Sequence, residues 1–221
     1  MLVQSQPSAP AGPSRVTTPL IQVVDDEEAI CALFERIGQL CGFDVACHGT
    51  AASFLDAYED ARPGCIVLDL MLPDRSGLEV LQEVADRGGK LPVVFVSGMA
   101  CVSEAVEALK LGSIDFIEQP FDIRQIADVL HRAIEMDVDR RIRSEEQDVF
   151  QRRFATLSPR EHEVMELVVK GAANKEVAAR LGLSHKTVEV HRANVMRKTQ
   201  STSLAELVWL HVAAEAYSPP A

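Results

Sequence analysis

Residues 65–77 read CIVLDLMLPDRSG. The apolar run from Cys65 to Leu68 predicts a short strand that is buried on both faces, with Asp69 at its carboxyl end. Pro73 and Gly77 then indicate a turn. Open parallel sheets place their functional groups at this end of their strands. Because aspartate is also common in turns and at the start of helices, the role of Asp69 depends on the rest of the chain.

Strands and helices alternate on both sides of this stretch. Each strand-like run is followed by apolar residues at helical spacing. Asp25 and Asp26 come directly after the first run, and Ser97 comes directly after the fourth. Five consecutive β-α units predict an α/β doubly wound parallel sheet. The expected strands lie at 20–24, 43–47, 65–68, 91–96 and 113–117.

The last helix of this half changes character along its length. From Ile126 to Ile134 its apolar residues have core spacing, whereas the segment from Glu135 to Arg153 is mostly charged. We expect this second segment either to continue the helix as a spacer or to be a disordered linker. In both cases it marks the boundary between two domains.

After residue 153 the spacing of apolar residues is helical throughout. Ser158 has the features of an N-cap, with Pro159 at the first helical position and Glu161 at the position of a capping box. Asn174 and Ser184 are expected to cap the next two helices, and a fourth helix follows. Two short helices joined by a tight turn are typical of a helix-turn-helix.

The bulk composition fits a two-domain protein. The 221 residues are 47% hydrophobic, and no apolar run approaches the ~20 residues needed to cross a bilayer. Residues 1–19 are expected to form a flexible Pro-rich tail, which lacks an apolar signal core. The five cysteines are odd in number and include no CxxC pair, which favours reduced thiols in a cytoplasmic protein.

Charge is divided unevenly along the chain. Residues 1–125 have a net charge of −11, whereas residues 154–221 have a net charge of +1. Within the second range, residues 184–199 hold four basic side chains and one acidic side chain. Such a local excess can neutralise DNA phosphates, although a solvated helix face is the more usual explanation of basic residues.

Several motifs stand in order along the chain: VVDDE at 23–27, LDLMLPDRSGLEVL at 68–81, VVFVSG at 93–98, Asp115-Phe116 with Pro120-Phe121, LSPREHEVMELVVKG at 157–171 and NKEVAARLGLSHKTVEVHRANVMRK at 174–198. Together they resemble the two-component response regulators of the FixJ/NarL (LuxR-type) class. The likeness covers nearly everything from residue 20 to residue 215. It implies a receiver domain at 20–135 with strand order 2-1-3-4-5, a linker at 136–153, and an all-α four-helix helix-turn-helix domain at 154–221.

The ends of the strands would bring three acids together at one edge of such a sheet. Asp25, Asp26 and Asp69 repel one another unless a cation lies between them, and Mg²⁺ prefers oxygen ligands. The resemblance implies that Asp26, Asp69 and the backbone carbonyl of Met71 bind Mg²⁺ directly. It also implies that Asp25 binds the ion through a water, and that Asp69 is the nucleophile that accepts a phosphoryl group.

Three further positions are implied to respond to the phosphoryl group. The hydroxyl of Ser97 would hydrogen-bond a phosphoryl oxygen, and Phe116 is the aromatic residue whose rotamer would change. Gln119 departs from the family, which has lysine before proline here. Its amide cannot offer the charge-assisted hydrogen bond of an ammonium group, which is roughly twice as strong. We therefore expect phosphorylation to be slower, or less well coupled to the switch.

The third helix of the second domain is the expected recognition helix, because its N-terminal half would enter the major groove of DNA. Basic side chains suit guanine edges and phosphates, asparagine suits adenine, and threonine and valine suit thymine methyl groups. His191 is ambiguous between a phosphate contact and a core position, and Trp209 between the core and a domain pair. The predicted DNA-binding residues are Lys186, Thr187, Glu189, Val190, His191, Arg192, Asn194, Arg197 and Lys198.

The leading hypothesis is a transcription factor that a sensor histidine kinase phosphorylates on Asp69. It would then bind double-stranded promoter DNA as a homodimer formed through the fourth helix and fifth strand of the receiver. The alternative is a DNA-binding regulator with a degenerate receiver, suggested by Gln119 and controlled by a partner or ligand. A phosphohydrolase ranks last, because Met71 stands where such an enzyme needs a second acid. We therefore expect no enzymatic activity beyond slow loss of the phosphate.

Overall fold

The computed structural model describes residues 17–98 and 102–216. Most of the predicted tail at 1–19 therefore lies outside the described residues. The chain divides into two compact units, at residues 1–139 and at residues 140–221.

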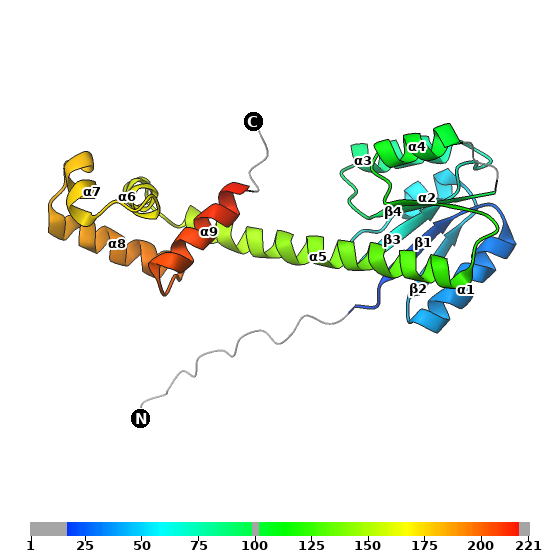
Figure 1. The fold of residues 1–221 in the computed structure, drawn as a ribbon, viewed down its shortest axis with the longest axis horizontal. Helices are drawn as coiled ribbons and strands as arrows, with labels where there is room; N and C mark the ends of the chain where they lie inside the picture. Colours follow the sequence, from blue (N-terminus) through cyan, green and yellow to red (C-terminus); the bar gives the residue numbers. More distant parts are fainter. Residues whose placement is uncertain (1–16, 99–101, 217–221) are drawn as a thin grey trace, which may run out of the picture. The chain divides into compact units, whose positions relative to one another are not determined.

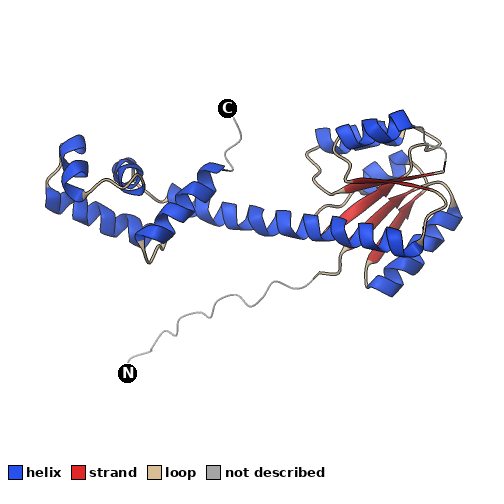
Figure 2. Ribbon diagram, viewed as in Figure 1, coloured by secondary structure: helices blue, strands red, loops and turns tan. Residues whose placement is uncertain are grey.

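The first unit is built around a five-stranded parallel sheet in the order β2-β1-β3-β4-β5 (Figures 1 and 2). This order and the helices between the strands confirm the predicted doubly wound fold. The strands are β1 (Leu20–Val24), β2 (Asp44–His48), β3 (Gly64–Leu68), β4 (Val93–Ser97) and β5 (Asp115–Glu118). The helices are α1 (Glu28–Cys41), α2 (Ala51–Ala57), α3 (Gly77–Asp86), α4 (Val102–Lys110) and α5 (Ile123–Ala155).

Alternate residues of each strand face opposite layers of helices. In β3, Cys65 and Val67 pack with buried side chains of α1 and α5. Ile66 and Leu68 pack with buried side chains of α2 and α3 on the other face. Because both faces are covered, β3 is a continuous apolar run with no polar alternation.

The last two strands begin two residues later than the sequence predicts. Before β4, Pro92 has no N–H to offer, and its carbonyl accepts a hydrogen bond from the N–H of Ile66 at 2.9 Å. Before β5, the N–H of Ser113 donates to the carbonyl of Ala108 at the end of α4, at 3.1 Å. Local hydrogen bonding therefore delays the start of β5.

Helix α5 is a single helix of 33 residues that continues past the end of the first unit. Its first part packs on the sheet through Ile126, Leu130 and Ala133. One turn further on, Asp137 is fully buried, and its carboxylate accepts a hydrogen bond from the N–H of Gly64 at 3.1 Å. Of the two expectations for residues 136–153, the structure contains the continued helix.

The second unit is all-α, as predicted, and follows the end of α5. Its further helices are α6 (Pro159–Val169), α7 (Asn174–Leu181), α8 (His185–Thr199) and α9 (Leu204–Ala216). Over the described ranges, no helix is both long and apolar enough to span a membrane. The core of this unit consists of Phe154, Leu157, Val164, Met165, Val168, Val177, Val188, Val195, Leu207 and Leu210.

Two of the three N-caps predicted for these helices are confirmed, and one is wrong. The side-chain oxygens of Ser158 and Ser184 accept backbone N–H groups in the first turns of α6 and α8. The prediction that Asn174 caps α7 is wrong, because the N-cap position is Ala173. The side chain of Asn174 instead accepts a hydrogen bond from Arg192 on α8 at 2.7 Å. A guanidinium group is a stronger donor than a backbone N–H, so the tertiary contact replaces the cap.

Candidate functional sites

Asp25 and Asp69 emerge side by side at the carboxyl edge of the sheet. Strands β1 and β3 are neighbours and pair in register from Leu20 with Gly64 to Val24 with Leu68. The next residue of each strand therefore lies at the same level. The N–H of Asp69 donates to the carbonyl of Val24 at 3.0 Å, which fixes the point where Asp69 leaves the sheet.

Asp25 is the most buried acid at this edge, with 5% of its surface exposed. Its Oδ1 accepts a hydrogen bond from the N–H of Glu27 at 2.8 Å. Burial raises the pKa of Asp25 to about 6, and the negative charges of Asp69, Glu27 and Asp26 add to the rise. The acids are therefore close enough to disfavour one another's ionisation, which is the situation that a bound cation relieves.

Asp69 is half-buried and accepts hydrogen bonds from the hydroxyl of Ser97 and from the backbone N–H groups of Leu70 and Met71. These bonds lower the pKa of Asp69, but burial outweighs them and the pKa is raised. Ser97 lies at the end of β4, with 3% of its surface exposed. Its hydroxyl therefore stands where it can contact a group attached to Asp69.

The turn after β3 depends on two residues whose roles the sequence did not reveal. A Cβ on Gly77 would lie 2.1 Å from the carbonyl oxygen of Asp69, so only glycine fits there. The carboxylate of Asp74 accepts the N–H groups of Ala51 and Ala52, both at 2.9 Å, and so holds the turn against the start of α2. The available signals, a glycine and an aspartate in a turn, are too general to indicate either contact.

Phe116 and Gln119 lie on and after β5. The ring of Phe116 stacks on that of Phe95, with ring centroids 6.3 Å apart. The N–H of Gln119 donates to the carbonyl of Ser97 at 2.9 Å, and the Gln119–Pro120 peptide is cis. Gln119 is half-buried, and its Oε1 lies 3.7 Å from the place where a Cβ on Gly98 would lie.

The chemistry of this edge fits Mg²⁺. Carboxylates and a backbone carbonyl are the hard oxygen donors that this ion prefers, and Met71 carries its carbonyl in the turn beside Asp69. The described residues contain no group of three or more His, Cys, Asp or Glu side chains already arranged as a metal site. Mg²⁺ usually keeps several waters and takes only one or two carboxylates, so a closed set of side chains is not required.

Helices α7 and α8 form the helix-turn-helix of the second unit. Gly182 ends α7 in the left-handed conformation, with φ of 65°, which a residue with a side chain rarely adopts. The guanidinium of Arg160 on α6 hydrogen-bonds the carbonyl of Leu181, the last residue of α7. The turn that positions α8 is thus held from a third helix.

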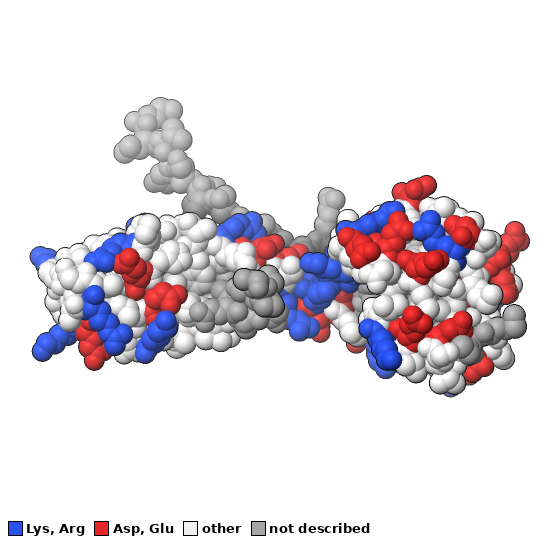
Figure 3. Space-filling view, turned by 90° about the horizontal axis from the view of Figure 1, so that it is seen from above, with Lys and Arg blue, Asp and Glu red and all other residues white. Residues whose placement is uncertain are grey.

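The exposed face of α8 carries a valine among charged residues. Val190 has 55% of its surface exposed, whereas Val188 and Val195 are buried. Lys186, Glu189 and Arg197 are also exposed. Figure 3 shows basic side chains along the visible face of the second unit. An apolar side chain held in water between charges is suited to a base edge such as a thymine methyl group.

Arg192 and Lys198, both predicted to bind DNA, are engaged within their own domain. Arg192 donates to Asn174, and the ammonium group of Lys198 donates to Glu161 at 2.6 Å and to the carbonyl of Thr156 at 3.0 Å. Glu161 has only 5% of its surface exposed, and the hydrogen bond from Lys198 lowers the pKa of Glu161 to about 2. The sequence did not distinguish these structural contacts from contacts to phosphate.

The remaining predicted residues of α8 differ in their surroundings. The Thr187 hydroxyl pairs with that of the N-cap serine at 2.7 Å, and Oδ1 of Asn194 accepts from Arg197 at 3.3 Å. Oε1 of Glu189 lies 3.4 Å from Nδ1 of His185, the first residue of α8. Nδ1 of His191 is buried and has no hydrogen-bond partner within the described part of the chain.

These features define a class of protein. It has an α/β domain with a cluster of acids at the carboxyl edge of its sheet, and a long helix joins this domain to a helix-turn-helix DNA-binding domain. The family described as response regulator receiver domain matches residues 21–131, and the family described as bacterial regulatory proteins, luxR family, matches residues 155–211. The chain belongs to the FixJ-type response regulators, which are two-component transcriptional regulators.

Individual relatives span almost the whole chain. It is 40% identical to the transcriptional regulatory protein FixJ of Azorhizobium caulinodans over 188 residues, which cover 85% of this chain and 89% of that protein. It is 39% identical to FixJ of Rhizobium meliloti over 193 residues, which cover 87% and 95%. Among solved structures, the response regulator StyR is 32% identical with a TM-score of 0.81, covering 91% of this chain and 100% of that chain.

Proposed function

We propose that Asp69 accepts a phosphoryl group from a sensor histidine kinase, and that this modification controls DNA binding. The observation that carries the proposal is the arrangement around Asp69. The carboxylate lies half-buried at the sheet edge, bonded to the hydroxyl of Ser97 and beside the acid Asp25, whose pKa is about 6. An accessible carboxylate next to a hydroxyl donor and a cation-binding group is what attack on phosphorus requires.

In the transfer step, an oxygen of Asp69 bonds to the phosphorus of the kinase phosphohistidine. The P–N bond breaks, and its electron pair leaves with the imidazole. The hydroxyl of Ser97 then donates to a phosphoryl oxygen, and Phe116 changes rotamer. When bound by Asp26, Asp69 and the carbonyl of Met71, with Asp25 acting through a water, Mg²⁺ supplies positive charge that neutralises the transferred group.

The proposed output is a homodimer on promoter DNA in the cytoplasm. Helix α4 presents exposed apolar residues, Val102, Val106 and Leu109, whose surfaces are 82%, 43% and 50% exposed. Such a row suits pairing of two receivers along α4 and β5. In the second unit, the exposed side chains of α8 would enter the major groove. Trp209 on α9 is 57% exposed, which leaves it available to pair two DNA-binding domains.

The test uses the full-length protein, Mg²⁺ and a small phosphodonor. Intact mass should show one added phosphate that is labile, and Asp69→Asn should abolish it. In a DNA titration, the phosphoprotein should bind more tightly than the unmodified protein, and Asp69→Asn should show no gain. A wild-type protein that takes up no phosphate, or takes it up equally in Asp69→Asn, contradicts the proposal.

Gln119 supports a second candidate, a DNA-binding regulator whose receiver responds to a partner or ligand. The observation is that Gln119, whose backbone N–H donates to the carbonyl of Ser97, carries a neutral amide where the family has lysine. This candidate predicts equal DNA affinity for the wild type and Asp69→Asn in the presence of phosphodonor. A phosphate-dependent gain of tenfold or more, on the order of 1.4 kcal/mol, would remove it.

A further inference from the structure

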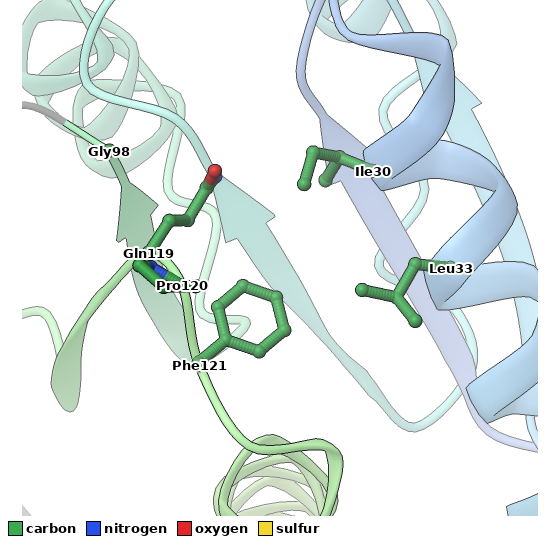
Figure 4. Close-up of a pocket in the computed structure, with 6 residues that line it drawn as sticks. All are labelled: Ile30, Leu33, Gly98, Gln119, Pro120 and Phe121. Carbon is green, nitrogen blue, oxygen red and sulfur yellow. The ribbon is translucent and has the colours of Figure 1, made fainter.

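Helix α1 borders two hollows of different character. On one side, Ile30 and Leu33 face the ring of Phe121 across an apolar cavity of about 440 Å³ (Figure 4). A second hollow, of about 320 Å³, lies beside the first turns of α1 and the end of β2. Cys31 from α1 and Cys47 from β2 both line this second hollow, so cysteines from two separate elements border the same space.

The thiols of Cys31 and Cys47 are neighbours. Both residues are half-buried and pack against the same core between the sheet and α1. Burial raises the pKa of the Cys47 thiol to about 12, and its hydrogen-bonding contact with the Cys31 thiol adds to the rise. The hollow that the two residues line gives a small solute access to both sulfur atoms.

The kind of ligand follows from the sulfur atoms. Sulfur is a soft ligand that selects soft cations, whereas the carboxylates of Asp25 and Asp26, which also border the hollow, are hard ligands that suit Mg²⁺. Over the described residues, no group of three or more acid, histidine or cysteine side chains is arranged to hold a metal ion. Zinc, which takes three or four protein ligands, is therefore poorly matched to this pair. Cu(I) binds two thiolates without a third ligand.

Oxidation of the pair is less well supported than metal binding. The thiolate rather than the thiol attacks an oxidant, and a pKa of about 12 keeps Cys47 protonated at neutral pH. A soft cation does not require a thiolate formed in advance, because it displaces the proton as the metal–sulfur bond forms.

We propose that Cys31 and Cys47 form a binding site for one Cu(I) ion. In the binding step, each thiol releases its proton to the solvent, two Cu–S bonds form, and the chelator that carried the ion leaves. Copper stays as Cu(I) and both sulfur atoms stay reduced. Binding requires no phosphoryl group on Asp69, so the proposal goes beyond the phosphoryl switch.

The test is a competition between the full-length reduced protein and bicinchoninate, a coloured Cu(I) chelator, in the absence of oxygen. The wild type should remove one equivalent of Cu(I) from the chelator and gain the ultraviolet absorption of sulfur-to-copper charge transfer. Cys31→Ser and Cys47→Ser should each remove none at the same chelator concentration. Cys41→Ser, which changes a half-buried thiol of α1 outside the hollow, should keep the full equivalent. No uptake by the wild type, or full uptake by both Cys31→Ser and Cys47→Ser, overturns the proposal.

Two further measurements identify the ligands without removing either thiol. Glu35 is exposed and borders the hollow one helical turn after Cys31, so Glu35→Gln tests whether a carboxylate takes part. This variant should keep the full equivalent of Cu(I), and loss of the ion would overturn a site made of two thiolates.

In the wild type, bound Cu(I) should protect Cys31 and Cys47, but not Cys41, from alkylation by iodoacetamide, measured by peptide mass spectrometry. Equal alkylation of the three thiols with and without Cu(I) overturns the proposal. This measurement decides the matter if Cys31→Ser or Cys47→Ser fails to fold.

Discussion

Replacing Asp25 by asparagine should stabilise the receiver at neutral pH in the absence of Mg²⁺. The folded protein raises the pKa of Asp25 from its ordinary value of 3.8 to about 6. Ionisation of this carboxyl therefore costs folding free energy, roughly 1.4 kcal/mol for each pKa unit, or about 3 kcal/mol in all. Asparagine keeps the Oδ1 that accepts the N–H of Glu27 but carries no charge, so we expect a gain of about 2–3 kcal/mol.

Because folding raises the pKa of Asp25, the stability gain of Asp25→Asn should depend on pH. A carboxyl whose pKa is raised by folding has no penalty below its unfolded pKa of 3.8, and the penalty grows as the pH rises to about 6. The stability gain of Asp25→Asn should therefore be full at pH 7.5 and below about 1 kcal/mol at pH 4. Saturating Mg²⁺ should reduce the difference in stability between Asp25→Asn and the wild type, because the ion stabilises the acid cluster of the wild type.

Hydrogen exchange is the suitable assay. The single tryptophan, Trp209, lies in the second unit, so its fluorescence does not report on the receiver. Amides of β1 and β3 should exchange roughly 30- to 150-fold more slowly in Asp25→Asn than in the wild type at pH 7.5. Asp128→Asn, which neutralises an exposed acid on α5, should have no such effect. A gain that is absent at pH 7.5, or equally large at pH 4, would refute the reasoning.

Four further substitutions test stability, DNA recognition and phosphate uptake separately. Glu161→Gln should destabilise the second unit by about 1–3 kcal/mol at pH 7, seen as a lower urea midpoint by Trp209 fluorescence. Because folding lowers the pKa of Glu161 to about 2 from 4.5, the wild type should lose this advantage as the pH falls through that range. Val190→Ala should weaken specific DNA binding roughly fivefold with an unchanged salt slope, whereas Lys186→Ala should reduce the salt slope by about one. Gln119→Lys should raise the rate of phosphate uptake roughly tenfold, measured with a small phosphodonor.

Controls for these variants come from the same helices. Glu163→Gln removes an exposed carboxylate on α6 and should change stability by less than about 1 kcal/mol. Val188→Ala removes a buried side chain of α8 and should lower stability, whereas Val190→Ala should not. Equal stability of Glu161→Gln and the wild type at pH 7 would mean that the buried pair contributes nothing net.

The sheet could be predicted from the sequence because its pattern is local. Five apolar runs, each followed by a helical stripe, determine the doubly wound class, and buried β3 shows the expected continuous run. The starts of β4 and β5 were predicted two residues too early, because Pro92 before β4 has no N–H to donate and the N–H of Ser113 before β5 is bonded to Ala108 at the end of α4. The contact of Ser113 depends on where α4 ends in the folded protein and leaves no pattern in the sequence, whereas Pro92 is present in the sequence.

The sites divide in a similar way. Positions of Asp25, Asp69 and Ser97 follow from strand ends, which the sequence places well. The contacts that Arg192 and Lys198 make within their own domain could not be predicted from the sequence, because their partners lie 18 and 37 residues away on other helices. Helical periodicity indicates which face a residue occupies, but it does not indicate which acceptor stands opposite that face.

Helix α8, the proposed recognition helix, is held at its start, in its middle and at its end by contacts within its own domain. Ser184 caps its start, Arg192 joins it to α7, and Lys198 joins its last turn to α6. A helix that is already ordered gives up little conformational entropy on binding. Calorimetry on the second unit's DNA complex should therefore show the heat-capacity change of surface burial between preformed partners. The larger heat-capacity change that is expected when a helix folds on binding should not be observed.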